Sequence, residues 1–206
     1  KFPMLTITSI SSDWSIWAPR LTGDFTVNLM ADKIEDSFKS NSTPIKVDWS
    51  PIPNKAISTA IKIIATHGAS DIDKTKEVFT EPPTGLLGIC NYVSGSTILI
   101  LFVCHSGKQS DSFFVHKLES MIDKLMSTGI EAIIAPCWPL HVDIAATYIN
   151  LFLNAIHALP NFNFFHIHWE TLGKLRELNP DPAVWANLHY YGNPQVIINK
   201  SYPNTL

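Results

Sequence analysis

The sequence is poor in the features that mark several large classes of protein. Its three cysteines are an odd number and form no CxxC pair, which argues against a disulfide framework or a cysteine zinc site. Charged residues make up only 16% of the chain, and no Lys/Arg cluster exists to neutralise phosphates, so we expect no direct nucleic-acid binding. No apolar run approaches the ~20 residues of a membrane span, and no signal-peptide pattern opens the chain. We therefore expect a soluble, cytoplasmic protein that binds no membrane.

What the chain does contain fits one folded domain. It has 206 residues, of which 46% are hydrophobic, and a formal net charge of -3. This length allows a sizeable core, and the apolar share excludes general disorder. The chain starts at Lys1, without an initiator methionine, and predicted structure begins almost at once. We therefore expect a fragment of a longer protein whose upstream part supplies regulation.

The most informative stretch is an apolar run over residues 97–103 that stops abruptly at a cysteine. The run lacks polar alternation, so it predicts a strand covered on both faces, as parallel strands are. Ser106-Gly107 then favours a turn, and Asp111 is a candidate N-cap for the next helix. Cys104 therefore lies at the carboxyl end of a central strand and near a helix N-terminus. Open α/β sheets bind ligands at this edge, and nearby backbone N–H groups stabilise a thiolate.

A second apolar run, over residues 60–66, ends in the same way at His67-Gly68. If the two strands are parallel neighbours, His67 and Cys104 lie at one edge of the sheet as a base and a nucleophile. Gly68 has no Cβ, so its N–H and that of Cys104 can approach a substrate carbonyl as oxyanion donors. His105 is a rival base, but adjacent residues of a strand face opposite sides. Without further information, the same residues also fit an inert strand-end cysteine and a His-Gly turn.

Strands and helices alternate along the rest of the chain, which predicts an α/β fold with right-handed crossovers. The pattern predicts the following elements: a strand within residues 2–10, an irregular aromatic connection to 23, a helix over 24–39 capped by Asp24, a short strand at 45–49, a loop at 69–95 with a helical turn or short strand, a helix at 111–128 ended by Gly129, a strand at 131–139, a helix at 143–159, a second helix ending at 178, and a final aromatic strand at 185–194.

Two further groups invite a chemical interpretation. His166 and His168 alternate as on one strand face, near Glu170, but a HxH pair without a third ligand is more often structural, and we expect no metal and no cofactor. Cys137 ends its own strand and is an alternative nucleophile. It lacks a following glycine turn, and the adjoining Trp138 favours packing.

Four of these segments, in this order, resemble the CHAT family of caspase-like peptidases, which are related to caspases and separase. The resemblance covers most of residues 60–194. It depends on these motifs: Thr66-His67-Gly68, Cys104-His105-Ser106-Gly107, the segment Gly129 to Trp138 with Pro139-Leu140 and Asp143, and Trp185-Ala186 with Tyr191-Gly192-Asn193-Pro194.

The resemblance implies a caspase-like three-layer sandwich with a mainly parallel central sheet flanked by helices. Residues 1–59 would form the N-terminal part of that fold and residues 60–206 the CHAT-like peptidase core. It also implies a Cys/His dyad, with His67 as general base and Cys104 as nucleophile, that hydrolyses a peptide bond in a protein substrate. An upstream regulatory domain or activator protein would control it, often in bacterial stress or antiphage defence.

The family also suggests where the substrate binds. In separase-like relatives an acidic residue in this region receives the basic side chain that precedes the cut, and this role transfers to Asp143. The acidic residue usually lies nearer the tryptophan than Asp143 does, so Asp143 is equally well interpreted as a helix N-cap. Asp71 and Asp73, in the loop after Gly68, are further candidates for a basic substrate or are solvated loop acids. Trp138 is a candidate wall of the same cleft.

The alternative function is a catalytically inactive caspase-like module that binds other proteins inside a larger sensor or effector. A hydrolase of a small amide or ester is a third interpretation. Labelling of Cys104 by a peptide electrophile distinguishes the enzyme from the interaction module.

Overall fold

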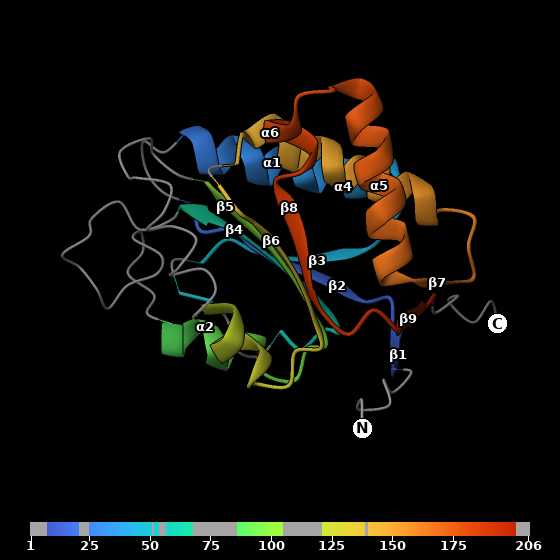
Figure 1. Cartoon of the computed structure of the whole chain (residues 1–206). Coiled ribbons are helices and arrows are strands. Elements are labelled where there is room, and N and C mark those ends of the chain that lie inside the picture. Colours follow the sequence, from blue (N-terminus) through green and yellow to red (C-terminus); the bar gives the residue numbers. More distant parts are fainter. Residues whose placement is uncertain are drawn as a thin grey trace.

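The computed structural model describes residues 8–20, 25–50, 52–53, 57–67, 86–104, 121–138 and 140–200. Residues 121–126 are helical. The other elements, labelled as in Figure 1, are β1 (Thr8–Ser11), β2 (Trp14–Trp17), α1 (Phe25–Ser40), β3 (Ile45–Asp48), β4 (Ile61–His67), α2 (Leu86–Val93), β5 (Ile98–Cys104), β6 (Ala132–Pro136), α4 (Val142–Ile156), β7 (Asn161–Asn163), α5 (Phe164–Leu178), α6 (Pro182–Trp185), β8 (Leu188–Gly192) and β9 (Val196–Asn199).

A six-stranded sheet in the order β3-β2-β4-β5-β6-β8 forms the centre of the fold. Every pair in it is parallel except β6 with β8, which is antiparallel. The predicted α/β class with a mainly parallel sheet is confirmed. Strands β2 and β3 belong to the same sheet as β4, so residues 14–48 and the strands that follow share one core.

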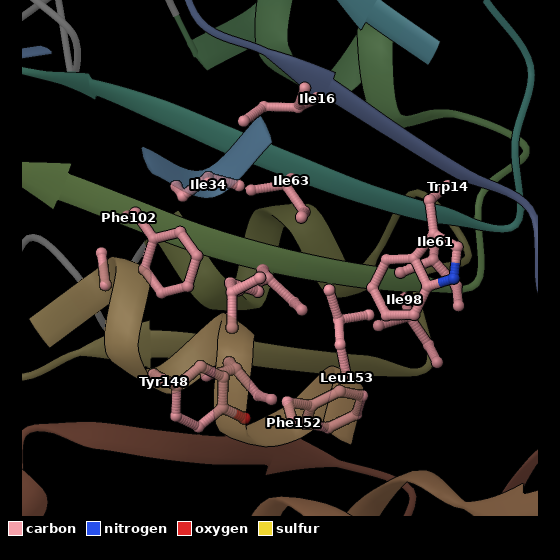
Figure 2. Close-up of a cluster of buried hydrophobic side chains, with 14 of the residues drawn as sticks. Trp14, Ile16, Ile34, Ile61, Ile63, Ile98, Phe102, Tyr148, Phe152 and Leu153 are labelled. Atoms are coloured by element: carbon pink, nitrogen blue, oxygen red, sulfur yellow. The ribbon is translucent and has the colours of Figure 1, made fainter. Parts of the chain in front are cut away.

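One face of the sheet packs against α1, α4 and α5, which lie together above it in Figure 1. Alternate residues of β4 and β5 supply this face, among them Ile63 and Phe102, and both are fully buried. Figure 2 shows these side chains meeting Ile34 of α1 and Tyr148 and Phe152 of α4. The continuous apolar runs of β4 and β5 are explained by this packing, because both faces of each strand are covered.

The opposite face packs against α2 and the helical residues 121–126. The intervening residues of the strands, such as Ile64 and Leu101, point to this side and are fully buried. In Figure 1, α2 lies below the sheet, on the side away from α1 and α4. Helices therefore cover the sheet on both faces, as the sequence predicts for strands without polar alternation.

Most predicted elements are present within a few residues of the expected bounds. The helix over 24–39 and the strands ending at His67, Cys104 and Pro136 are confirmed. Gly129 adopts φ +100°, a left-handed conformation suited to a helix end, and so confirms the predicted stop. Asp24 and Asp111, the two predicted N-caps, lie outside the described residues.

Four predictions of local structure are wrong. Residues 14–17 are not an irregular connection but strand β2, whose two tryptophans are almost completely buried. Within the segment 69–95, α2 is an eight-residue helix rather than a single turn. Residues 164–169 form the first part of α5 instead of a strand. The final aromatic strand is shorter than predicted, because residues 182–185 form α6 and the strand β8 begins at Leu188.

A second, three-stranded sheet joins the two ends of the described chain in the order β1-β9-β7. Strand β1 pairs in parallel with β9, from Thr8 opposite Val196 to Ser11 opposite Asn199. Strands β7 and β9 are not among the elements predicted from the sequence. The pairing of β1 with β9 joins segments that are almost the whole chain apart. Within the ranges that the structure describes, no helix is both long and apolar enough to cross a bilayer.

Candidate active site

The register of β4 and β5 brings His67 and Cys104 together. Seven residue pairs connect the two strands, and the last of them pairs His67 with Cys104. Neighbouring strands lie ~4.8 Å apart, so the two backbones are adjacent at the carboxyl edge of the sheet. The prediction that these strands are parallel neighbours ending at one edge is confirmed.

The structure describes the backbone of His67 and Cys104. The residues that follow them, Gly68, Asp71 and Asp73 on one side and His105 on the other, lie outside the described residues. The proposed oxyanion donor at Gly68 and the roles of the loop acids therefore stay predictions. Strand β2 lies beside β4 and strand β6 beside β5, so these two strands flank the pair.

The loop after β6 is fixed to the start of β8 by one buried amide. The backbone N–H groups of Cys137 and Trp138 both donate to Asn187 Oδ1, each at 3.1 Å, and Cys137 N–H also donates to Asn187 O at 2.9 Å. Asn187 is fully buried. This residue therefore holds the chain segment that contains Trp138 at the same edge of the sheet as Cys104. Sequence reasoning missed it, because a single Asn before a strand has no distinctive pattern.

Trp138 is partly buried at this edge. Its indole N–H donates to Ala183 O of α6 at 2.8 Å, and its ring lies edge-on to His189 with centroids 6.4 Å apart. These contacts fix the orientation of the ring beside the loop, and its role as a cleft wall stays a prediction.

Cys137 is the alternative nucleophile, and its side chain contacts a phenol. Its Sγ lies 3.6 Å from Tyr191 Oη, and the residue is half-buried. A phenol is a much weaker base than an imidazole, so it is a poor acceptor for a thiol proton. This contact therefore does not activate Cys137 as an imidazole would.

Asp143 does not cap α4. His141 is the N-cap, and Asp143 N–H donates to His141 Nδ1 at 3.3 Å, so the N-cap interpretation of Asp143 is wrong. The Asp143 carboxylate lies in the first turn, where the helix dipole favours negative charge. It forms an ion pair with Lys33 of α1, and this bond lowers the pKa of the carboxyl. A basic substrate side chain that binds Asp143 therefore competes with Lys33.

The HxH pair does not form a metal site. Both histidines lie on α5, where two residues span about 200° around the axis, so they point in different directions. His166 is exposed, with Nε2 3.2 Å from Glu170, whereas His168 is buried, with Nδ1 2.9 Å from Tyr148 Oη. The strand alternation assumed for them is wrong. Across the part of the chain that is described, no three His, Cys, Asp or Glu side chains gather in a way that would hold a metal.

A scan against protein-family models finds no matching family, and a search of curated proteins finds no match either. The resemblance to the CHAT family therefore depends on the sequence motifs quoted above alone.

A buried lysine on β4 is a further feature that sequence reasoning did not single out. Lys62 is 1% exposed, its Nζ donates to Tyr92 O in the last turn of α2, and it lies 4.0 Å from the centre of the Tyr92 ring. Burial lowers the pKa of Lys62 to about 8. The contact joins α2 to the strand that ends at His67. The sequence does contain a signal for this feature, because Lys62 is a single lysine inside the otherwise apolar run of residues 60–66.

Proposed function

We propose that this chain is a caspase-like cysteine endopeptidase domain in which Cys104 is the nucleophile and His67 the general base. The observation that supports it most directly is the pairing of the two residues in register at the carboxyl edge of a parallel sheet. This edge is where open α/β sheets bind their ligands. The order of the motifs along the chain adds the peptidase class and the protein substrate.

In the proposed reaction His67 takes the thiol proton of Cys104, and the sulfur attacks the carbonyl carbon of the scissile peptide bond. The backbone N–H groups of Gly68 and Cys104 hold the negative oxygen of the tetrahedral intermediate. The C–N bond then breaks as His67 gives its proton to the leaving amine, which leaves a thioester on Cys104. Water, deprotonated by His67, attacks the thioester and releases the new carboxyl terminus with the free thiol.

The substrate is a protein or peptide, and the loop held by Asn187 forms one wall of its cleft through Trp138. Asp143 receives a basic side chain that precedes the cut by displacing Lys33 from its ion pair. An upstream regulatory domain or an activator protein controls access to the cleft, in a bacterial defence or stress response.

The test is covalent labelling with a peptidyl chloromethyl ketone whose leading residue is arginine, followed by peptide mass spectrometry. We expect modification of Cys104 in preference to Cys90 and Cys137. His67→Ala should slow the labelling of Cys104 by about a hundredfold or more, because general-base assistance is lost. Cys137→Ala, at the same edge of the sheet, and His166→Ala, an exposed histidine of α5, are the controls, since neither residue has a role in the mechanism.

Equal labelling of the three cysteines, or an unchanged rate in His67→Ala, would contradict the mechanism and favour the non-catalytic interaction module. Proteomic identification of new protein termini, after expression of the full-length protein with its genomic neighbours, would then identify the substrate. Cys104→Ala should remove those termini and leave the fold intact.

A further inference from the structure

A small cavity lies between α5, α6 and β8. Its volume is about 230 Å³. Strand β8 is an edge strand, separated from β5 by β6, and Figure 1 shows α5 and α6 beside it. Rings make up most of the lining, contributed by Phe165, His168, Trp169, Trp185, His189 and Tyr190. Among the described lining residues there is no Lys, Arg, Asp or Glu.

His168 has a defined tautomer, because its partner is a buried phenol. Tyr148 is fully buried, and burial raises the pKa of its hydroxyl well above the usual range, so the proton stays on. A buried O–H needs an acceptor, and His168 Nδ1 lies 2.9 Å from Tyr148 Oη. Tyr148 therefore donates to Nδ1, and the ring carries its own proton on Nε2. Burial also lowers the pKa of His168 to about 4, which keeps the ring neutral at pH 7.

The Nε2–H group of His168 is then a donor that has no acceptor among the described residues. His168 is 1% exposed and lines the cavity, and its ring makes no second hydrogen bond with any residue that the structure describes. A ring N–H that has no partner in the described part of the protein can donate to an acceptor in the cavity that its residue lines. An acceptor atom placed in the cavity would satisfy it.

Aromatic rings surround this donor. Phe165 lies edge-on to Tyr190 and to Trp169, with centroids 5.0 Å and 6.0 Å apart. Trp169 is 54% exposed, an unusual exposure for a tryptophan, and it leaves one of the rings that line the cavity open to solvent. A planar ligand would cover this ring and pack against the others.

We propose that this cavity binds an uncharged, single planar ring that bears a carbonyl-type acceptor, with the acceptor bonded to His168 Nε2–H and the ring packed against Trp169. The cavity is smaller than the ~300–1,000 Å³ typical of sites for drug-sized molecules, which limits the ligand to one ring. A charged ligand meets no opposite charge in the lining, so a neutral one is favoured. The site is independent of Cys104 and does not depend on the proposed peptidase activity.

Two probes of nearly the same shape test the proposal. Benzamide presents a carbonyl acceptor, whereas benzamidine replaces it with a charged donor group. We would titrate each into the ¹⁵N-labelled chain and follow the indole N–H signals of the six tryptophans, assigned by Trp→Phe variants. Benzamide should shift the Trp169 and Trp185 signals saturably and leave that of Trp17 unchanged, because Trp17 donates to Ser50 O on the far side of the sheet. Benzamidine should bind at least about tenfold more weakly, the effect of one lost hydrogen bond.

Variants separate the ring contact from the hydrogen bond. Trp169→Ala should weaken benzamide about fivefold, whereas Leu178→Ala, an exposed residue of the same helix outside the cavity, should not. His168→Phe should abolish the preference for benzamide over benzamidine. If that variant does not fold, Tyr148→Phe combined with His168→Phe removes the unpaired phenol and repeats the test. The proposal would be overturned if the two probes bound equally or if millimolar benzamide caused no shift. It would also be overturned if the cation tetramethylammonium bound more tightly than benzamide.

Discussion

His67 and Cys104 are the final register partners of β4 and β5, and both strands are central in the sheet. Six further pairs fix the same register, from Ile61 with Ile98 to Thr66 with Val103. A slip of one residue would turn every apolar side chain of one strand to the other face. The hydrophobic core therefore determines that this histidine and this cysteine lie side by side.

The register itself can be tested with His67→Cys. Register partners on neighbouring strands are separated by ~4.8 Å between backbones, within the ~4.4–6.8 Å that a disulfide requires between Cα atoms. Under mild oxidation we expect the introduced thiol to form a disulfide with Cys104, detected by mass spectrometry of the non-reduced digest. Thr66→Cys is the matched control, because Thr66 pairs with Val103 and belongs to the opposite face of the sheet. Efficient cross-linking of Thr66→Cys instead would show that the register is different.

Lys62 predicts a specific dependence of stability on pH. The pKa of its ammonium falls from 10.5 to about 8 on folding, so between these values the unfolded chain binds more protons and stability rises with pH. The free energy of unfolding gains about 3 kcal/mol by pH 10.5, and this gain is lost again as the pH falls through 8. Urea unfolding of Lys62→Met between pH 7 and 10.5 should lack this rise. Lys46→Met, on the exposed part of β3, should retain it.

The ion pair between Lys33 and Asp143 predicts a shift that can be measured directly. Lys33 lowers the pKa of the Asp143 carboxyl, so the pair stabilises the fold above the unfolded pKa and is lost as the pH falls through the folded one. Lys33→Ala should raise the pKa of Asp143 toward 3.8, as followed by NMR titration of its carboxyl carbon. Overall stability should change little, because both side chains are exposed to solvent.

The same variant tests the role of Asp143 in substrate binding. If Asp143 receives a basic side chain, Lys33→Ala should speed labelling by the arginine-containing electrophile. Lys39→Ala is the control, since Lys39 pairs with Glu35 and Asp36 on α1. A slower reaction in Lys33→Ala would assign the recognition of the basic side chain to other residues.

The sequence predicts the centre of this fold well, because the central strands are long and buried on both faces. β4, β5 and β6 are continuous apolar runs, and the amphipathic pattern of α1 and α4 is unambiguous. The arrangement of His67 and Cys104 follows from those runs. It requires only that the two strands be parallel neighbours.

The errors lie where short segments depend on distant partners. β2 has four residues, and only its position between β3 and β4 explains its buried tryptophans. The start of α5 has alternating histidines that suggest a strand, but its buried residues, from Phe164 through Ile167 and His168 to Leu175, follow the helical period. The site partners Lys33 and Asn187 were also missed, because their roles arise from contacts between segments far apart in the chain.

The pairing of β1 with β9 has a consequence for anything joined to this domain. It places both ends of the described chain together, next to the amino ends of the central strands. Cys104 lies at the other end of β5, and seven strand residues extend about 23 Å. An inhibitory or sensor segment joined to either end of the described chain must therefore extend over about the length of the sheet to contact Cys104.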